Sequence, residues 1–429
     1  MPRYADMSKA ELETELAQVR ARYDEMVARG LSLNMARGKP SAAQLELSLP
    51  MLDVLDADAD LIAEDGTDCR NYGVLDGIPE AKRLMAALLD DEPDNVIVLG
   101  NASLTAMYDA MARLMLFGTQ GAAPWNQLPA VKWLCPVPGY DRHFTICEAF
   151  GIEMIPVAMD EHGPNMDEVE RLVAADEAVK GIWCVPKYSN PTGATYADEV
   201  VRRLAAMDAA APDFRIFWDN AYAVHHFSAD AAEQDTVLDI AVACAEAGNP
   251  DRYLKFGSTS KITFPGAGVA AVAASPANVA EIKRHMNAQA IGHDKLNQLR
   301  HARFLNEGAG LAEHMARHGA LMGPKFELVC RRLDEELTEA AVATWTTPRG
   351  GYFVSFDGPD GTARRIVELA KGAGVTMTGA GATWPYGNDP ADGNIRIAPS
   401  LPPLEELDAA MDVFCCCVKL AALEQLLAA

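Results

Sequence analysis

The chain has 429 residues and a formal net charge of −24, so it is too long for one ordinary hydrophobic core. Its acidity disfavours binding to a phosphate backbone or to an anionic lipid surface, which argues against nucleic acid and membrane as partners. The length predicts two domains, one large and one smaller, and the hydrophobic share of 49% argues against disorder of the whole chain.

The cysteines and the first residues favour a cytoplasmic protein. The nine cysteines are scattered, with no CxxC pair and no Cys/His ligand spacing, so we expect reduced thiols and no metal site. The N-terminal residues MPRYADMSKAELE lack the apolar stretch of a signal peptide. No apolar run reaches the length that a membrane span requires.

The first predicted element is a helix followed by an arm. Ser8 and Glu11 have the spacing of a capping box, and Gly30 can end the helix that begins there. The stretch 33–50 shows no periodicity and predicts an extended arm. We assign residues 1–50 to this helix and arm, which join the smaller domain.

A large α/β domain is predicted over residues 51–305, because short apolar runs alternate there with helical patterns. Such alternation indicates a mostly parallel sheet covered on both faces. The predicted strands are 95–99, 131–135, 181–185, 214–218, 253–256 and 268–273, and the predicted helices are 104–116, 196–210 and 237–247.

A smaller α+β domain is predicted over residues 306–429. A long helical pattern begins after residue 293, and a second alternation follows it. The predicted strands are 341–345, 352–356, 375–378 and 394–398, and the predicted helices are 364–371 and 404–427.

Four polar residues stand at or near the ends of predicted strands. Asn190 follows strand 181–185, Asp219 follows 214–218, and Lys261 follows 253–256, while Arg396 lies in the last strand. Alone, each has an ordinary interpretation: a turn, a helix cap, a solvated loop residue or a surface ion pair. Together they favour a site, because parallel sheets bind ligands at the carboxyl ends of their strands.

The set matches the chemical needs of pyridoxal phosphate. A lysine such as Lys261 holds the aldehyde as a Schiff base and is then free to move protons. The Asp219 carboxylate can stabilise the protonated pyridine nitrogen. Tyr222 and Asn190 can donate to the ring oxygen, and the Arg396 guanidinium suits bidentate binding of a substrate carboxylate.

These motifs resemble a known family. The segments SNPTG, DNAY and STSK, with the late arginine, resemble fold type I pyridoxal-phosphate enzymes of the class I aspartate aminotransferase superfamily. The segments LNMARGKP, RNYG and GSTSKITFPGAGV resemble an atypical bacterial aspartate aminotransferase subgroup related to the catalytic domains of MocR-type regulators. The resemblance implies a large domain with a mostly parallel sheet and a smaller α+β domain.

The resemblance also implies roles for further residues. Tyr140 matches an aromatic residue that stacks on the cofactor ring, although a core tyrosine would fit the same pattern. Tyr72 matches a tyrosine that reaches the phosphate from the other subunit, which implies a homodimer with shared active sites. Gly38 matches a glycine that touches substrate when the small domain closes. The residues implied to bind the phosphate and its surroundings are Asn101, Ala102, Ser103, Ser258 and Ser260.

One position departs from the family pattern. Relatives usually carry a phosphate-binding arginine eight residues after the lysine, where this chain has Val269. Either backbone amides and hydroxyls replace it, or another base such as Lys187 or a residue of the second subunit does. We expect amides and hydroxyls, since a helix N-terminus and a glycine-rich loop both offer donors.

Transamination by a ping-pong mechanism is the expected reaction, with aspartate and glutamate as the implied amino donors. A lyase or decarboxylase on the same fold remains an alternative, as does a non-enzymatic amino-acid sensor. The residue that binds a distal carboxylate stays open. The candidates are Arg37, Lys39, Arg142, Lys187 and residues 297–303 of a second subunit.

Overall fold

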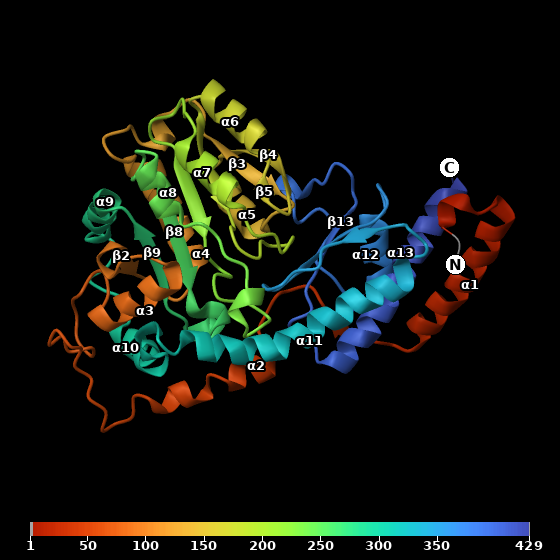
Figure 1. Cartoon of the computed structure of the whole chain (residues 1–429), viewed down its shortest axis with the longest axis horizontal. Coiled ribbons are helices and arrows are strands. Elements are labelled where there is room, and N and C mark those ends of the chain that lie inside the picture. The colour runs from red at the N-terminus through yellow and green to blue at the C-terminus, as the bar shows by residue number, and fades with distance from the viewer. Residues whose placement is uncertain (1–2, 429) are drawn as a thin grey trace.

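The computed structural model describes residues 3–428, so residues 1, 2 and 429 of the expected domains lie outside the described residues. The described residues contain three sheets, of eight, three and two strands, and the chain is built around the two larger ones (Figure 1). We call the parts around them the large-sheet part and the small-sheet part. Helix α11 (Leu311–Leu337) runs from one to the other.

The eight-stranded sheet confirms the expected mostly parallel arrangement. Strands β8, β7, β6, β3 and β4 are parallel neighbours, whereas β9, β2 and β5 are added antiparallel at the two edges. The strand order is β2 (Val96–Val98), β9 (Ala270–Ala274), β8 (Tyr253–Ser258), β7 (Arg215–Asp219), β6 (Val179–Cys184), β3 (Lys132–Val137), β4 (Glu153–Asp160) and β5 (Gly163–Pro164). The central strands β6 and β7 are buried along their whole length, as expected for a sheet covered on both faces.

Helices cover both faces of this sheet. One apolar cluster contains residues of α4, α5 and α9, and a different cluster contains residues of α6, α7 and α8. The first includes Trp133, Trp183 and Phe217, whose rings meet edge to face or tilted. The helices are α3 (Pro79–Leu89), α4 (Ser103–Phe117), α5 (Asp141–Ala149), α6 (Met166–Ala175), α7 (Asp198–Ala206), α8 (Ile240–Glu246), α9 (Pro276–Met286) and α10 (Lys295–Phe304).

The small-sheet part combines the two ends of the chain. Its antiparallel sheet has the order β10 (Thr344–Trp345), β11 (Val354–Asp357) and β13 (Asn394–Ile397). Helices α12 (Ala363–Gly372) and α13 (Leu404–Ala428) adjoin it, and α1 (Lys9–Ala28) packs against α13 (Figure 1). Strand β1 (Leu33–Asn34) pairs with β12 (Val375–Thr376), which ties the arm to this part.

The predicted N-terminal helix is confirmed, including its capping box between Ser8 and Glu11. The prediction of an extended arm over 33–50 is wrong in two places, because residues Ala42–Glu46 form the short helix α2 and a 3-10 helix begins at Leu49. Ser41 and Gln44 make a second capping box there, which stabilises a helix too short to show periodicity. Strand β4 was also not among the predicted strands.

The cysteine run lies in α13, where Cys415, Cys416 and Cys417 are fully buried. All nine cysteines are free thiols. Within residues 3–428, no helix is long and apolar enough to cross a lipid bilayer.

Candidate active site

The carboxyl ends of neighbouring parallel strands bring the predicted polar residues together. Asp219 is the last residue of β7, and Lys261 ends the short 3-10 helix Thr259–Lys261 that directly follows the adjacent strand β8. Asn190 lies in the turn after β6, the neighbour of β7 on the other side. Arg396, from β13 of the small-sheet part, reaches this turn through a hydrogen bond to Asn190.

One carboxylate oxygen of Asp219 forms a hydrogen bond, and the other has no partner. His143 Nε2 lies 3.0 Å from Asp219 Oδ2, and both side chains are almost completely buried. Asp219 Oδ1 is buried and has no hydrogen-bond partner. An unpaired buried carboxylate oxygen is costly, which indicates that a donor group belongs beside it.

His143, a residue that was not predicted from the sequence, fixes this carboxylate in place. Its ring stacks on Trp183 at a centroid distance of 4.3 Å and an angle of 9°, and the edge of Tyr140 meets it at 5.0 Å. Tyr140, the predicted ring-stacking residue, therefore lies beside the Asp219 carboxylate. Burial, assisted by the negative charge of Asp219, raises the pKa of Tyr140 to about 12 and keeps its hydroxyl protonated.

Lys261 is enclosed by aromatic rings. Its Nζ lies 4.9 Å from the ring centroid of Tyr222 and 5.9 Å from that of Tyr352. Burial lowers the pKa of the Lys261 amine, the charge of Asp219 opposes this shift, and the charge of Arg396 adds to it. A lowered pKa increases the fraction of neutral amine, the form that acts as nucleophile and base.

Arg396 is held on several sides. Its Cζ lies 4.8 Å from the ring centroid of Phe353, while its Nη1 donates to Asp141 Oδ1 at 2.9 Å and to Asn190 Oδ1 at 3.2 Å. Its Nε is buried without a partner. Gly38 of the arm lies so close to Phe353 that a Cβ there would be 2.5 Å from Phe353 Cζ, so only glycine fits without displacing the ring.

A second group of predicted residues meets at the start of α4. Ser258 Oγ donates to Ser260 Oγ at 3.0 Å, and Ser260 Oγ donates to the carbonyl oxygen of Asn101 at 3.2 Å. Ala102 is the N-cap of α4 and has no side chain to cap the helix that begins at Ser103. The free amides of this first turn, with the two hydroxyls, form an anion-binding arrangement.

Val269 and Lys187 do not supply a cation to this arrangement. Val269 is buried in an apolar cluster, and its N–H donates to Thr259 Oγ1 at 2.9 Å. Lys187 lies over the ring of Tyr188, 5.7 Å from its centroid, and interacts with Asp235 and His226. Burial lowers the pKa of Lys187 to about 8.

A buried network behind Lys261 was not predicted. The carbonyl oxygen of Ile262 accepts a hydrogen bond from His314 Nε2 at 2.7 Å, and His318 lies 3.2 Å from His314. The Gln44 amide donates to His318 Nδ1 at 3.3 Å and to the Tyr352 hydroxyl at 3.0 Å. The network joins α2 and α11 to the segment that carries Lys261, and it requires His318 to be neutral so that Nδ1 can accept.

The buried histidines predict a loss of stability in mild acid. Burial lowers the pKa of His318 and His301 to about 4, below the ordinary value of 6.5. The unfolded chain therefore binds more protons between pH 6.5 and 4, so the free energy of unfolding falls as the pH falls through that range. Each pKa unit corresponds to about 1.4 kcal/mol per histidine.

Urea unfolding at pH 7.5, 6.5 and 5.0 measures this effect, and the midpoint is expected to drop between the last two values. His318→Gln is expected to reduce the drop, whereas substitution of the exposed His162 leaves it unchanged. Equal midpoints at pH 6.5 and 5.0 would contradict the prediction.

Tyr72 is a predicted site residue that does not join the other site residues within the single chain. Its side chain is 84% exposed, in a loop that Lys295 holds through a hydrogen bond to the Gly73 carbonyl. The role implied for Tyr72 requires a second subunit, and its exposure leaves it available for such contact.

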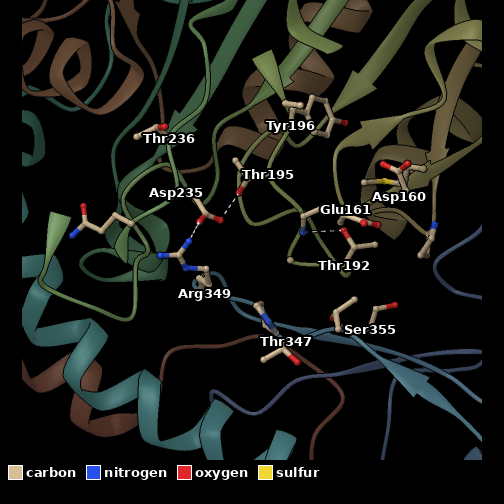
Figure 2. Close-up of a pocket in the computed structure, with 18 of the residues that line it drawn as sticks. Asp160, Glu161, Thr192, Thr195, Tyr196, Asp235, Thr236, Thr347, Arg349 and Ser355 are labelled. Carbon is tan, nitrogen blue, oxygen red and sulfur yellow. Dashed lines mark hydrogen bonds and ion pairs between the residues drawn. The ribbon is translucent and has the colours of Figure 1, made fainter. Parts of the chain in front are cut away.

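A cavity of about 750 Å³ lies beside the Asn190 turn, between the two sheets. Figure 2 shows Asp235 between Thr195 and Arg349. Asp235 Oδ2 accepts a hydrogen bond from Thr195 Oγ1 at 2.9 Å, and Asp235 Oδ1 lies 3.2 Å from Arg349 Nη1. Lys261, Asp219 and Arg396 do not line this cavity, and Arg349 is already paired. Its remaining charged lining is acidic, from Asp160, Glu161, Asp198, Asp235 and Asp357. The cavity is therefore ill suited to bind a substrate carboxylate.

Comparison with known proteins agrees with this geometry. The family model described as aspartate amino-transferase matches residues 7–429. A Mycolicibacterium smegmatis protein named putative aminotransferase is 50% identical over 407 residues, which cover 94% of each chain. A Corynebacterium glutamicum protein named aspartate aminotransferase is 46% identical over 433 residues, covering 99% of each chain. The crystal structure of an aspartate transaminase from Corynebacterium glutamicum matches with a TM-score of 0.94 at 46% identity and covers 98% of both chains.

The match over nearly the whole length, together with relatives near 50% identity, shows the family. The chain belongs to the aspartate aminotransferase family and is a transaminase of the mixed α/β fold expected from its sequence.

Proposed function

We propose that the chain is a pyridoxal-phosphate-dependent aspartate aminotransferase, which moves the amino group between aspartate or glutamate and a 2-oxo acid by a ping-pong mechanism. The observation that carries the proposal is the buried, unpartnered Oδ1 of Asp219 beside the enclosed amine of Lys261. The name of the 46% identical Corynebacterium glutamicum relative supports the choice of substrate.

The residues present fit pyridoxal phosphate. Asp219 Oδ1 offers a carboxylate oxygen for a protonated ring nitrogen, and Tyr140 lies next to it for stacking on the ring. Ser258, Ser260 and the first amides of α4 offer donors for the phosphate. The cofactor supplies an aldehyde for covalent attachment to Lys261 and a ring that takes up electrons.

The chain's own residues then have separate tasks. Arg396 binds the α-carboxylate of the substrate, with Asn190 orienting its guanidinium. The Lys261 amine takes the proton from the substrate Cα and delivers it to a carbon of the cofactor. Its lowered pKa favours the neutral amine, which is the form that can act as this base. Asp219 keeps the ring nitrogen protonated, and Tyr222 donates to the ring oxygen.

The arm supports a dicarboxylate substrate. Arg37 and Lys39 flank Gly38, which touches the ring of Phe353 on which Arg396 is stacked. Both cations are exposed, and neither forms an ion pair within residues 3–428. They are therefore available for the distal carboxylate of aspartate, together with residues that a second subunit brings.

We further propose a cytoplasmic homodimer in which Tyr72 completes the partner's site. Exposed apolar side chains in two segments, residues 49–72 and 291–296, support this surface, and the hydrogen bond from Lys295 to the Gly73 carbonyl joins the two regions. They are Leu49, Leu52, Ile62, Tyr72, Ile291 and Leu296. The nine free thiols fit a reducing compartment. We also propose that residues 51–305 form the large domain, and that 1–50 and 306–429 form the small one.

The test combines a spectrum with product analysis. Purified protein loaded with pyridoxal phosphate should show the visible band of the lysine-bound cofactor, and aspartate should bleach it and release oxaloacetate. Adding 2-oxoglutarate should restore the band and give glutamate. If aspartate had a kcat/KM no higher than that of alanine or an aromatic donor, the substrate proposal would fail. Release of ammonia or carbon dioxide would indicate a lyase or decarboxylase instead.

A further inference from the structure

The Arg396 guanidinium already forms an ion pair with a carboxylate of the same chain, that of Asp141. Asp141 Oδ1 accepts from Nη1 at 2.9 Å, and Asn190 shares the same nitrogen at 3.2 Å. The Nε is buried without a partner, so the group is not saturated. Asp141 opens α5 of the large-sheet part, whereas Arg396 lies in β13 of the small-sheet part, so the ion pair crosses between them.

We propose that Asp141 determines how tightly Arg396 binds a substrate carboxylate, because the Asp141 carboxylate competes for the same guanidinium. Asp141 thereby sets KM for the amino and oxo acids alike. The inference rests on the proposed role of Arg396 in carboxylate binding, and it adds a residue that the family signatures described above do not include.

The exposure of the two partners differs in the way that competition requires. The Arg396 side chain is only 7% exposed and packs against the ring of Phe353, which holds it in the site. The Asp141 side chain is 34% exposed and can turn towards water. Asp141 also lies in the first turn of α5, where the helix N-terminus stabilises a negative charge. Its carboxylate therefore keeps a favourable environment when a substrate takes its place.

The charges give the direction of the effect. An incoming carboxylate meets a guanidinium that is already paired, and it is repelled by the Asp141 charge a few ångströms away. At such a distance in a partly hydrated site, the repulsion weakens carboxylate binding by about tenfold. Competition therefore lowers the affinity for substrate and product alike, which raises KM without changing the chemical step.

A simple orienting role for Asp141 leads to the opposite expectation. If Asp141 only held Arg396 in position, its loss would leave KM unchanged or raise it. Asp141→Asn separates the two roles, because the asparagine oxygen can still accept from Nη1 while the charge is gone. Asp141→Ser serves as a second variant if the first is unstable, since serine is well tolerated at the start of a helix.

The experiment compares Asp141→Asn with Glu148→Gln, an exposed position on the same helix that undergoes the same change of charge. The first readout is calorimetric binding of maleate, a dicarboxylate that cannot react, to the cofactor-loaded enzyme. We expect the Kd of maleate to fall by about tenfold in Asp141→Asn and to stay unchanged in Glu148→Gln. The second readout is kinetic: KM for aspartate falls by a similar factor while kcat stays within about twofold.

The outcomes separate this inference from the proposed function. If Asp141→Asn and Asp141→Ser both bind maleate no more tightly than Glu148→Gln, competition by Asp141 is overturned while transamination stands. If Arg396→Lys leaves both maleate binding and KM unchanged, the role proposed for Arg396 fails, and the competition falls with it.

Discussion

Replacing Lys261 with alanine is expected to reduce kcat for transamination by a factor on the order of 10⁴ or more. Within residues 3–428, Lys261 is the only lysine whose amine lies beside Asp219 and near the rings of Tyr222 and Tyr352. Among the described residues, no other side chain next to Asp219 has an amine that could both attach the cofactor and carry the proton. Single-turnover kinetics with aspartate measures the loss, and the visible band of the bound cofactor is expected to be absent.

Lys187 offers a matched control for this variant. It is also a lysine whose pKa is lowered by partial burial, to about 8, but it lies beside Tyr188 and Asp235 rather than Asp219. Lys187→Met is expected to retain the band and most of the activity. Borohydride reduction of the wild type, followed by peptide mass spectrometry, should place the cofactor on Lys261. Finding it on Lys187 would overturn the assignment.

Asp219→Asn is expected to lower kcat by about 10²–10³, with the fold unchanged. The amide has the size of the carboxylate but not its charge, so a ring nitrogen at the Oδ1 position is no longer held in its protonated form. The affinity for the cofactor is also expected to fall, which titration of the visible band measures independently of turnover.

Two companion variants sharpen this test. Asp219→Glu restores the charge and should recover part of the activity lost in Asp219→Asn. His143→Phe keeps an aromatic ring next to Trp183 but removes the hydrogen bond to Oδ2, so its effect is expected to be smaller. Activity of Asp219→Asn within about threefold of the wild type would show that the carboxylate charge does not serve the ring nitrogen.

Much of the site could be predicted because its signals are local. Asp219 and Lys261 each follow a buried apolar strand, and a parallel sheet gathers such positions at one edge. The amides at Ala102 and Ser103 were predictable for the same reason, since a strand followed directly by a helix exposes free donors.

The residues that were missed depend on contacts between distant segments. His143 lies three residues after Tyr140, but nothing near it indicates that its ring meets a carboxylate 76 residues away. Gln44 and His318 are separated by 274 residues and meet only because α2 packs against α11. The Ser41–Gln44 capping box was visible, yet a helix of five residues has too few turns to show an apolar stripe.

The burial of the cysteines has a practical consequence. Eight of the nine thiols are buried and Cys330 is partly buried, and burial raises the pKa of Cys330 and the three thiols of α13. Because the thiolate is the reactive form, these groups react slowly with maleimide dyes. A cysteine introduced on the outer face of α7 and another on α12 can therefore be labelled without removing any natural thiol. Fluorescence energy transfer between them would follow the distance between the two sheets during a catalytic cycle in the otherwise unaltered chain.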